Sequence, residues 1–255
     1  MSNRIVKQIV YGMFYLLSLG LIGGSVYLGY FKPAASCVDK VKNQSEEEVD
    51  CGGSCVACAI RKLKPIKVLP LQLFDIGNNT SSVLVELENP NLNYGASHLA
   101  YTVTLYDGTN GTLTSLNGDT FLHAGEVKTL VFPALEVPFR NITRGEFTIR
   151  DLAWLAAEEF PRPNIEVREV VTKREGKTAI VEGVVQNNNS YGLHQAIVSA
   201  IAMNRAGLFA DASRTVLADI QPFEERFFKI VIPLLDADAA TLDTARTRVT
   251  VDTRR

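Results

Sequence analysis

The clearest indication of the fold is the stretch VLVELENPNLNYGASHLAYTVTLYDGTNG at residues 83–111. Apolar side chains recur at every second position on both sides of the turn signal Asn-Pro-Asn at residues 89–91. The alternating residues are Val83, Val85 and Leu87, and then Leu99, Tyr101, Val103 and Leu105. A period of two places such side chains on one face of a strand, so the pattern predicts half-buried β-strands.

Turn signals continue beyond this stretch at a spacing of roughly ten residues. They are Asp107 to Gly111, Asn117 to Asp119 and Ala124 to Glu126. Short strands with such punctuation are typical of antiparallel sandwiches. We therefore predict an all-β body of two tandem antiparallel immunoglobulin-like sandwiches, at residues 71–160 and 161–255.

The first of these regions is similar to small bacterial sandwiches of the FxLYD type and to the related LEA14 or water-stress (WHy) domains. The residues that carry the resemblance are Asn89, Pro90 and Asn91 after one strand, and Leu105, Tyr106 and Asp107 before a glycine-rich hairpin. It spans roughly residues 71–154. The resemblance implies an immunoglobulin-type fold with a binding or protective role, and it offers no active-site residue.

The second region repeats the first when the chain is shifted by 97 positions. Val83, Leu87, Asn91, Tyr94, Gly95 and Asp107 then fall on Ile180, Val184, Asn188, Tyr191, Gly192 and Asn204. Pro161 and Pro163 lie where the two copies would join. A tandem repeat of one sandwich is therefore expected.

The run QIVYGMFYLLSLGLIGGSVYLGYF, residues 8–31, carries no charge between Lys7 and Lys32. About 20 helical residues cross the hydrocarbon core of a bilayer, so this run predicts a single-pass transmembrane helix after a tail at 1–7. A cleaved signal peptide ending near Ala34 and Ala35 is the alternative, but signal cores span only about 7 to 15 residues. We expect a retained signal-anchor in the lipid bilayer.

All four cysteines lie in the segment 32–58, within CVDKVKNQSEEEVDCGGSCVAC. This string resembles a surface motif of chiefly bacterial secreted proteins, CxDxxxNxxExxxDCGGxCxxC. The resemblance implies an extracytoplasmic knot in which Cys37, Cys51, Cys55 and Cys58 form two disulfides. Four cysteines allow three pairings, and the sequence does not choose among them. Disulfides suit an oxidising compartment, which places the N-terminus in the cytoplasm and the remainder outside.

Other chemistry is possible in this segment. Asp39, Asn43, Glu46 and Asp50 offer the carboxylate and amide oxygens that calcium prefers, and a solvated acidic loop is the alternative. A four-thiolate zinc site and a redox role for Cys55 and Cys58 compete with the disulfides. Residues 59–70, with four basic residues and two prolines, read as an extended linker.

The rest of the sequence argues against catalysis. The formal net charge is -2, which disfavours nucleic-acid binding. His98, His123 and His194 form no metal-binding pair, and no nucleophile elbow or phosphate loop occurs in the sequence. We expect neither an enzyme nor a resident cofactor, calcium apart. The expected role is a non-catalytic binding or structural module of the cell envelope with an unknown protein partner. A stress-protective envelope protein is the alternative, and an enzyme with an interdomain site comes third.

Overall fold

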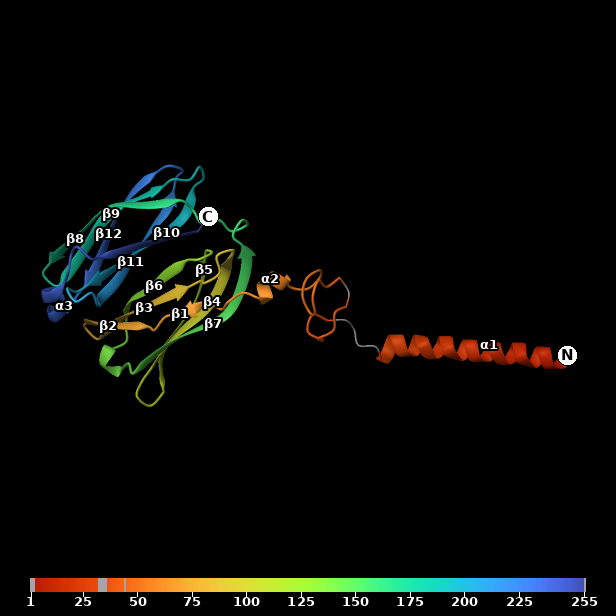
Figure 1. Cartoon of the computed structure of the whole chain (residues 1–255). Helices are drawn as coiled ribbons and strands as arrows, with labels where there is room; N and C mark the ends of the chain where they lie inside the picture. The colour runs from red at the N-terminus through yellow and green to blue at the C-terminus, as the bar shows by residue number, and fades with distance from the viewer. Residues whose placement is uncertain (1–2, 32–35, 44, 255) are drawn as a thin grey trace. The chain divides into compact units, whose positions relative to one another are not determined.

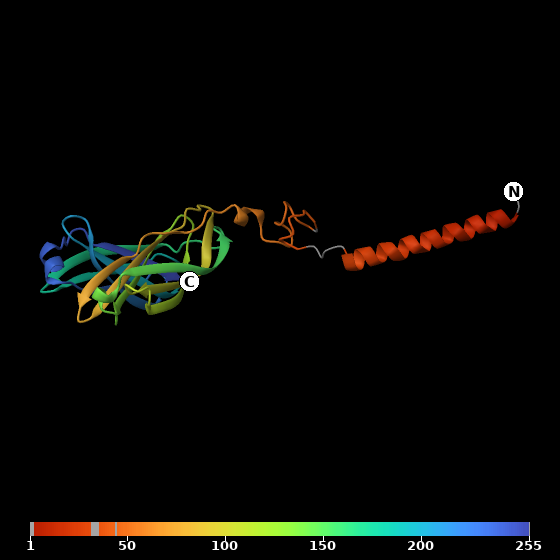
Figure 2. The ribbon, with the colours of Figure 1, turned by 90° about the horizontal axis from the view of Figure 1, so that it is seen from below.

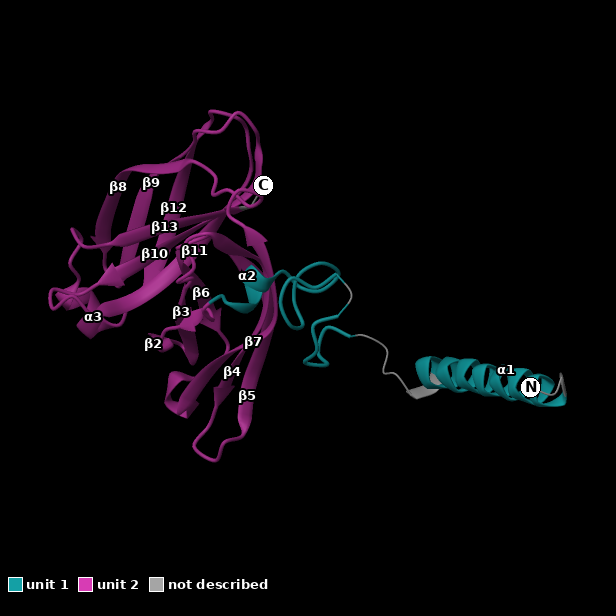
Figure 3. Ribbon diagram, turned by 45° about the vertical axis from the view of Figure 1, so that its right-hand side comes forward, with its two compact units in different colours: residues 1–63 teal, residues 64–255 magenta. Residues whose placement is uncertain are grey.

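The computed structural model describes residues 3–31, 36–43 and 45–254 (Figure 1). The chain divides into two compact units, residues 1–63 and residues 64–255 (Figure 3). Lys32, Ala34 and Ala35, which bear on the extent and cleavage of the anchor, lie outside the described residues. The boundary between the two units lies within the segment 59–70, which was expected as a linker.

The first unit begins with one long helix. It comprises α1 (Asn3–Val26), which continues as a π-helical turn η1 (Tyr27–Phe31) (Figure 2). The stretch Arg4–Gly29 is long and apolar enough to cross a membrane. Its large apolar side chains are exposed, with Leu16 and Leu19 each 72% accessible. The helix therefore begins several residues before the uncharged run. Its apolar side chains do not pack against a core in the described part of the first unit.

The segment expected as a linker contains regular structure. Residues Cys58–Arg61 form the short helix α2, and Lys67–Val68 form strand β1. Lys67 pairs with Glu88, and Val68 pairs with Leu87. Part of the segment 59–70 is thus regular structure, which the sequence did not indicate because a two-residue strand is too short to show alternation.

The second unit consists of four small antiparallel sheets. Besides β1, its strands are β2 (Gln72–Gly77), β3 (Thr80–Glu88), β4 (Tyr94–Tyr106), β5 (Thr112–Leu122), β6 (Val127–Leu135), β7 (Arg144–Ala156), β8 (Ile165–Glu175), β9 (Thr178–Asn187), β10 (Leu193–Met203), β11 (Phe209–Ile220), β12 (Glu225–Pro233) and β13 (Arg248–Arg254). Two short helices complete it, η2 (Phe139–Asn141) and α3 (Asp236–Thr241). The predicted all-β class is confirmed.

The four sheets form two sandwiches. In the first, β3 pairs with β1, β2 and β6, and β4 lies between β5 and β7. In the second, β9 lies between β8 and β12, and β10 lies between β11 and β13. Each sandwich has its own apolar core, built from the inward face of the alternating strands. A third cluster joins the two sandwiches and comprises Phe74, Leu84, Val131, Ile201 and Ala212.

One predicted turn proves to be strand. Asp107–Gly111 and Ala124–Glu126 connect strands as expected, whereas Asn117–Asp119 lies within β5. A Cβ on Gly118 would lie 2.5 Å from the Tyr101 hydroxyl. Glycine is therefore required at this position because the buried Tyr101 ring crosses it, and Asn-Gly-Asp resembled a turn for that reason.

Candidate functional site

The cysteine segment is closed by two disulfides. Cys37 is bonded to Cys55, and Cys51 is bonded to Cys58. The Cα–Cα distances of 5.6 and 4.9 Å lie within the usual disulfide range. No cysteine is left free. The structure therefore selects one of the three possible pairings and leaves no thiolate for the zinc or redox alternatives.

Two of the four candidate calcium ligands form a local hydrogen-bond cluster. The Asp39 carboxylate accepts hydrogen bonds from the backbone N–H groups of Val41 and Ser36 and from Nδ2 of Asn43, at 2.9, 3.2 and 2.8 Å. These donors, the Val41 amide foremost, lower the pKa of Asp39. Asp39 thus caps the backbone of its own loop.

The other two candidates, Glu46 and Asp50, are buried and serve the same purpose. Glu46 Oε2 accepts the N–H groups of Asn43 and Asp50, and Asp50 Oδ1 accepts the N–H of Lys40 at 2.9 Å. The carboxylates predicted as calcium ligands thus act as acceptors for the backbone between the two disulfides. Calcium binding by these residues stays a prediction.

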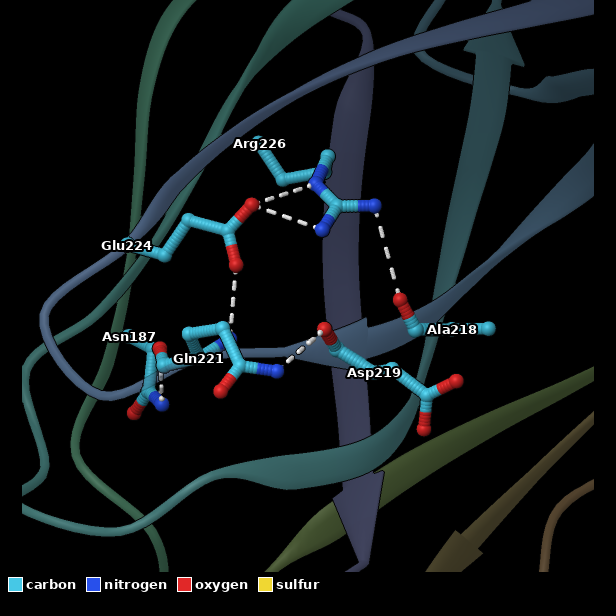
Figure 4. Close-up of polar contacts among 6 residues, drawn as sticks. All are labelled: Asn187, Ala218, Asp219, Gln221, Glu224 and Arg226. Atoms are coloured by element: carbon cyan, nitrogen blue, oxygen red, sulfur yellow. Dashed lines mark hydrogen bonds and ion pairs between the residues drawn. The ribbon is translucent and has the colours of Figure 1, made fainter.

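A pair of asparagine-centred turns is the most detailed polar feature of the second unit. One such turn lies in each sandwich. The turn in the second sandwich is centred on Asn187 and is drawn in part in Figure 4, and we call it the second-sandwich clasp. Asn187 Nδ2 donates to the carbonyl oxygens of Tyr191 and Gln221, both at 2.9 Å. Its Oδ1 accepts the backbone N–H and the Nδ2 of Asn189. One fully buried side chain therefore ties the connection between β9 and β10 to the connection between β11 and β12.

A carboxylate closes this clasp on the side of β12. Glu224 accepts the backbone N–H of Gln221 at 2.6 Å (Figure 4). Its other oxygen accepts two hydrogen bonds from Arg226, from Nε at 2.9 Å and from Nη2 at 2.6 Å. These donors lower the pKa of Glu224, with the Gln221 amide as the largest cause. The negative charge of the clasp is thus compensated within the clasp itself.

The first sandwich carries the same turn around Asn89, the first-sandwich clasp. Asn89 Nδ2 donates to the carbonyl oxygens of Tyr94 and His123, at 2.8 and 2.9 Å, and Asn89 Oδ1 accepts both donors of Asn91. Glu126 accepts the His123 backbone N–H at 2.6 Å. The hydrogen bonds correspond one to one with those around Asn187.

The matching bonds correct the expected repeat register. Asn189, and not Asn188, makes the bonds that Asn91 makes, so the shift through β3 and β9 is 98 positions. At Tyr94 and Tyr191 the shift returns to the expected 97. The difference arises because the connection that follows Asn187 is one residue shorter than the one that follows Asn89.

The two clasps differ in how their carboxylates are compensated. Lys128 occupies the position of Arg226 but forms an ion pair of 2.7 Å with Asp252 on β13 of the second sandwich. The Lys128 side chain is only 2% exposed, and its ammonium also lies 3.3 Å from the centre of the Phe121 ring. The basic group nearest in place of Lys128 is Arg162, whose Nη2 lies 3.8 Å from Glu126 Oε1.

A cavity of about 270 Å³ lies beside the first-sandwich clasp, between the two sandwiches. It is lined by His123, Glu126, Val127, Lys128, Thr129, Arg162, Pro163, Ile165, Val167, Val249, Thr250, Val251, Asp252 and Thr253. Burial lowers the pKa of His123 and of Lys128 and raises that of Asp252. Concave sites with a few converging polar groups are the usual form of small-molecule sites, so this cavity is the candidate functional site.

Sequence reasoning did not find this cavity. It considered His123 only as a metal ligand and gave no role to Lys128 or Asp252. The available signal was the spacing of Glu126 and Lys128, which matches that of Glu224 and Arg226, with lysine in the place of arginine. Asp252 lies 124 positions beyond Lys128, and no pattern along the chain indicates that contact.

Another buried carboxyl group between the sandwiches is that of Asp211 on β11, which lies near the other end of β6. Asp211 is 2% exposed and lines a mostly apolar cavity of about 390 Å³ together with Pro133 and Ala134 of β6. Ser82 Oγ of the first sandwich donates to Asp211 Oδ1 at 2.6 Å. Burial raises the pKa of Asp211 to about 7. This carboxyl group connects the two sandwiches without a cation.

Comparison with known proteins does not identify a family. No family model matches the sequence, and no curated protein sequence matches it. Among solved structures, red sea bream transglutaminase is 13% identical, with 76% of this chain and 30% of that chain covered and a TM-score of 0.27. Ruminococcus gnavus β-glucuronidase is 10% identical, with 86% and 44% covered and a TM-score of 0.20. The chain thus spans less than half of each, and similarity this low supports no argument about function.

Proposed function

We propose that the chain is a single-pass protein of the cell envelope that holds a non-catalytic binding body outside the membrane. The observation that carries this proposal is the order of the first unit. A helix long and apolar enough to span a bilayer, with its large apolar side chains exposed, precedes a segment closed by two disulfides. Lipid would cover the helix, and disulfides persist in oxidising compartments.

The binding role rests on the second unit. Its two sandwiches present connecting loops and strand edges, which capture partners in many unrelated sandwich proteins. The matching clasps around Asn89 and Asn187 support two copies of one module, as the resemblance to FxLYD and LEA14 domains implies. The body therefore has the construction of a receptor or a structural module, and a protein partner at the cell surface remains part of the proposal.

Topology is tested by labelling intact cells with a membrane-impermeant maleimide, with and without an impermeant reductant. We expect labelling of Cys37, Cys51, Cys55 and Cys58 only after reduction, because the disulfides would lie outside and oxidised. A Ser2→Cys variant is the matched control, and its added thiol should be labelled only after lysis. Labelling of the four native cysteines only after lysis would overturn the proposal.

A further inference from the structure

The cavity of about 270 Å³ lies beside the turn whose carboxylate has the longer contact with a basic group, and the two otherwise matching turns differ in that respect. In the second-sandwich clasp, Arg226 satisfies Glu224 directly through two hydrogen bonds. In the first-sandwich clasp, Lys128 has its partner on the other sandwich, and Glu126 Oε1 has only the 3.8 Å contact with Arg162. Glu126 is 5% exposed and lines the cavity, and no hydrogen bond to its Oε1 comes from the described residues. A ligand with hydrogen-bond donors would supply one.

The ring of His123 adds a second acceptor without a donor. Its Nδ1 lies 3.4 Å from the Phe160 carbonyl oxygen, which can only accept, so the proton of the neutral ring lies on Nδ1. Its Nε2 is then an acceptor, and it is buried with no partner in the part of the chain that the structure describes. The ring itself stacks on Phe160 with centroids 4.4 Å apart, which fixes its orientation. Buried polar atoms of this kind are rare in folded proteins, and a ligand hydroxyl group would satisfy this one.

The charges around the cavity balance. Among the described lining residues, Glu126 and Asp252 are acidic, and Lys128 and Arg162 are basic. A carboxylate or phosphate ligand would meet the two acidic groups, and an ammonium ligand would meet the two basic groups. The arrangement therefore favours a neutral ligand that both donates and accepts hydrogen bonds.

The remaining walls and the volume define the ligand further. Branched apolar residues and threonines of β6, β8 and β13 make up most of the remaining lining, and they are Val127, Thr129, Ile165, Val167, Val249, Thr250, Val251 and Thr253. A sugar ring presents the same combination, apolar C–H faces and a rim of hydroxyl groups. At about 270 Å³ the cavity lies just below the roughly 300–1,000 Å³ of drug-sized sites, which suits one ring.

We propose that this cavity binds a neutral polyhydroxylated ligand of the size of one hexose unit. Its hydroxyl groups donate to His123 Nε2 and Glu126 Oε1 and accept from Arg162, and its C–H face packs on the valines. This deepens the proposed binding role but does not depend on the membrane topology, so the labelling experiment and a binding experiment fail separately.

The test is isothermal titration calorimetry of the full chain in a polyoxyethylene detergent, whose headgroup contains no sugar. The probes are glucose, galactose, mannose and N-acetylglucosamine, with glucosamine and glucuronate as the charged comparison. We expect saturable one-to-one binding of at least one neutral sugar, at least tenfold tighter than either charged sugar. Absence of saturable binding by all four neutral sugars, or tighter binding of a charged one, would overturn the proposal.

Two variants locate the site. His123→Phe retains the ring that stacks on Phe160 but removes Nε2, and Glu126→Gln retains an acceptor for the His123 N–H but replaces the other oxygen with a donor. Each should weaken sugar binding at least tenfold, the effect of about one hydrogen bond. The matched control, Glu224→Gln in the second-sandwich clasp, should leave affinity unchanged. Circular dichroism verifies folding, and equal affinity in a folded His123→Phe would overturn the assignment.

Discussion

The clasps around Asn89 and Asn187 share their backbone bonds and differ in one ion pair. In both, a fully buried asparagine satisfies the carbonyl groups of two connections, and a glutamate caps the second of them. Arg226 pairs with Glu224 of its own turn, whereas Lys128 pairs with Asp252 of the other sandwich. The comparison shows that the backbone turn is a structural device and that a single basic side chain decides whether it also joins the sandwiches.

The largest expected effect is a difference in stability between variants of Lys128 and variants of Arg226. Lys128→Met leaves the Asp252 carboxylate buried and unpaired, which should lower the free energy of unfolding by about 3–5 kcal/mol. Arg226→Met removes a pair whose side chains are 38% and 28% exposed, and it should cost about 1 kcal/mol or less. Urea unfolding followed by the fluorescence of Trp154, the single tryptophan, measures the first value, and circular dichroism measures both.

A double variant provides the control for this comparison. Lys128→Met combined with Asp252→Leu removes both charges and should recover most of the lost stability, since an apolar pair often replaces a buried ion pair without loss. Equal costs for Lys128→Met and Arg226→Met would show that the contact between the sandwiches contributes no more than a surface pair.

Because the two clasps share the hydrogen bonds of their asparagines, removing either asparagine should lower the stability equally. Asn89→Ala and Asn187→Ala each leave two carbonyl groups without their donor, and each should lower the free energy of unfolding by about 2–3 kcal/mol. The same urea experiment compares them. A cost confined to Asn89 would mean that the second turn is held by other contacts, and the proposed equivalence of the two copies would fail.

The sequence predicted what depends on local pattern. Alternation at Val83 to Leu105 gave the strands, the uncharged run gave the helix, and the crowded cysteines gave a disulfide segment. Prediction from the sequence failed where a contact joins residues far apart in the chain, and where a residue typical of turns serves another purpose. Gly118 looked like a turn residue because its contact with Tyr101 crosses the sheet, and β1 was read as linker because its partner lies in β3.

The candidate site was beyond prediction for the same physical reason. Its buried charges become partners only when two sandwiches that are folded from separate parts of the chain pack together. Lys128 and Asp252 each read as an ordinary solvated residue on a strand. The difference between lysine and arginine at matched positions was visible in the sequence, but the repeat register was one residue off at that point, which hid the correspondence.

The two ends of β6 provide a final and smaller contrast. Near Lys128 a buried carboxylate has a cation, whereas Asp211 faces only the Ser82 hydroxyl and the Ala212 N–H, with the negative charge of Asp238 nearby. Its pKa is raised to about 7 from 3.8, so the folded state retains a proton that the unfolded state releases. Stability therefore falls as the pH rises from about 4 to about 7, by up to roughly 1.4 kcal/mol per pH unit, and is unaffected by this group above that range.

Asp211→Asn should remove this pH dependence. The amide keeps an acceptor for Ser82 but places an N–H₂ group where Oδ2 has no partner among the described residues, so part of the gain is lost. We expect a net increase of about 1 kcal/mol at pH 8 and a decrease or no change at pH 4, measured by urea unfolding at both values. Because Lys128 already neutralises its end of the junction, Asp252→Asn should instead destabilise at both pH values. If Asp211→Asn and Asp252→Asn changed the free energy of unfolding in the same direction at both pH values, the contrast between the paired and the unpaired carboxyl group would be contradicted.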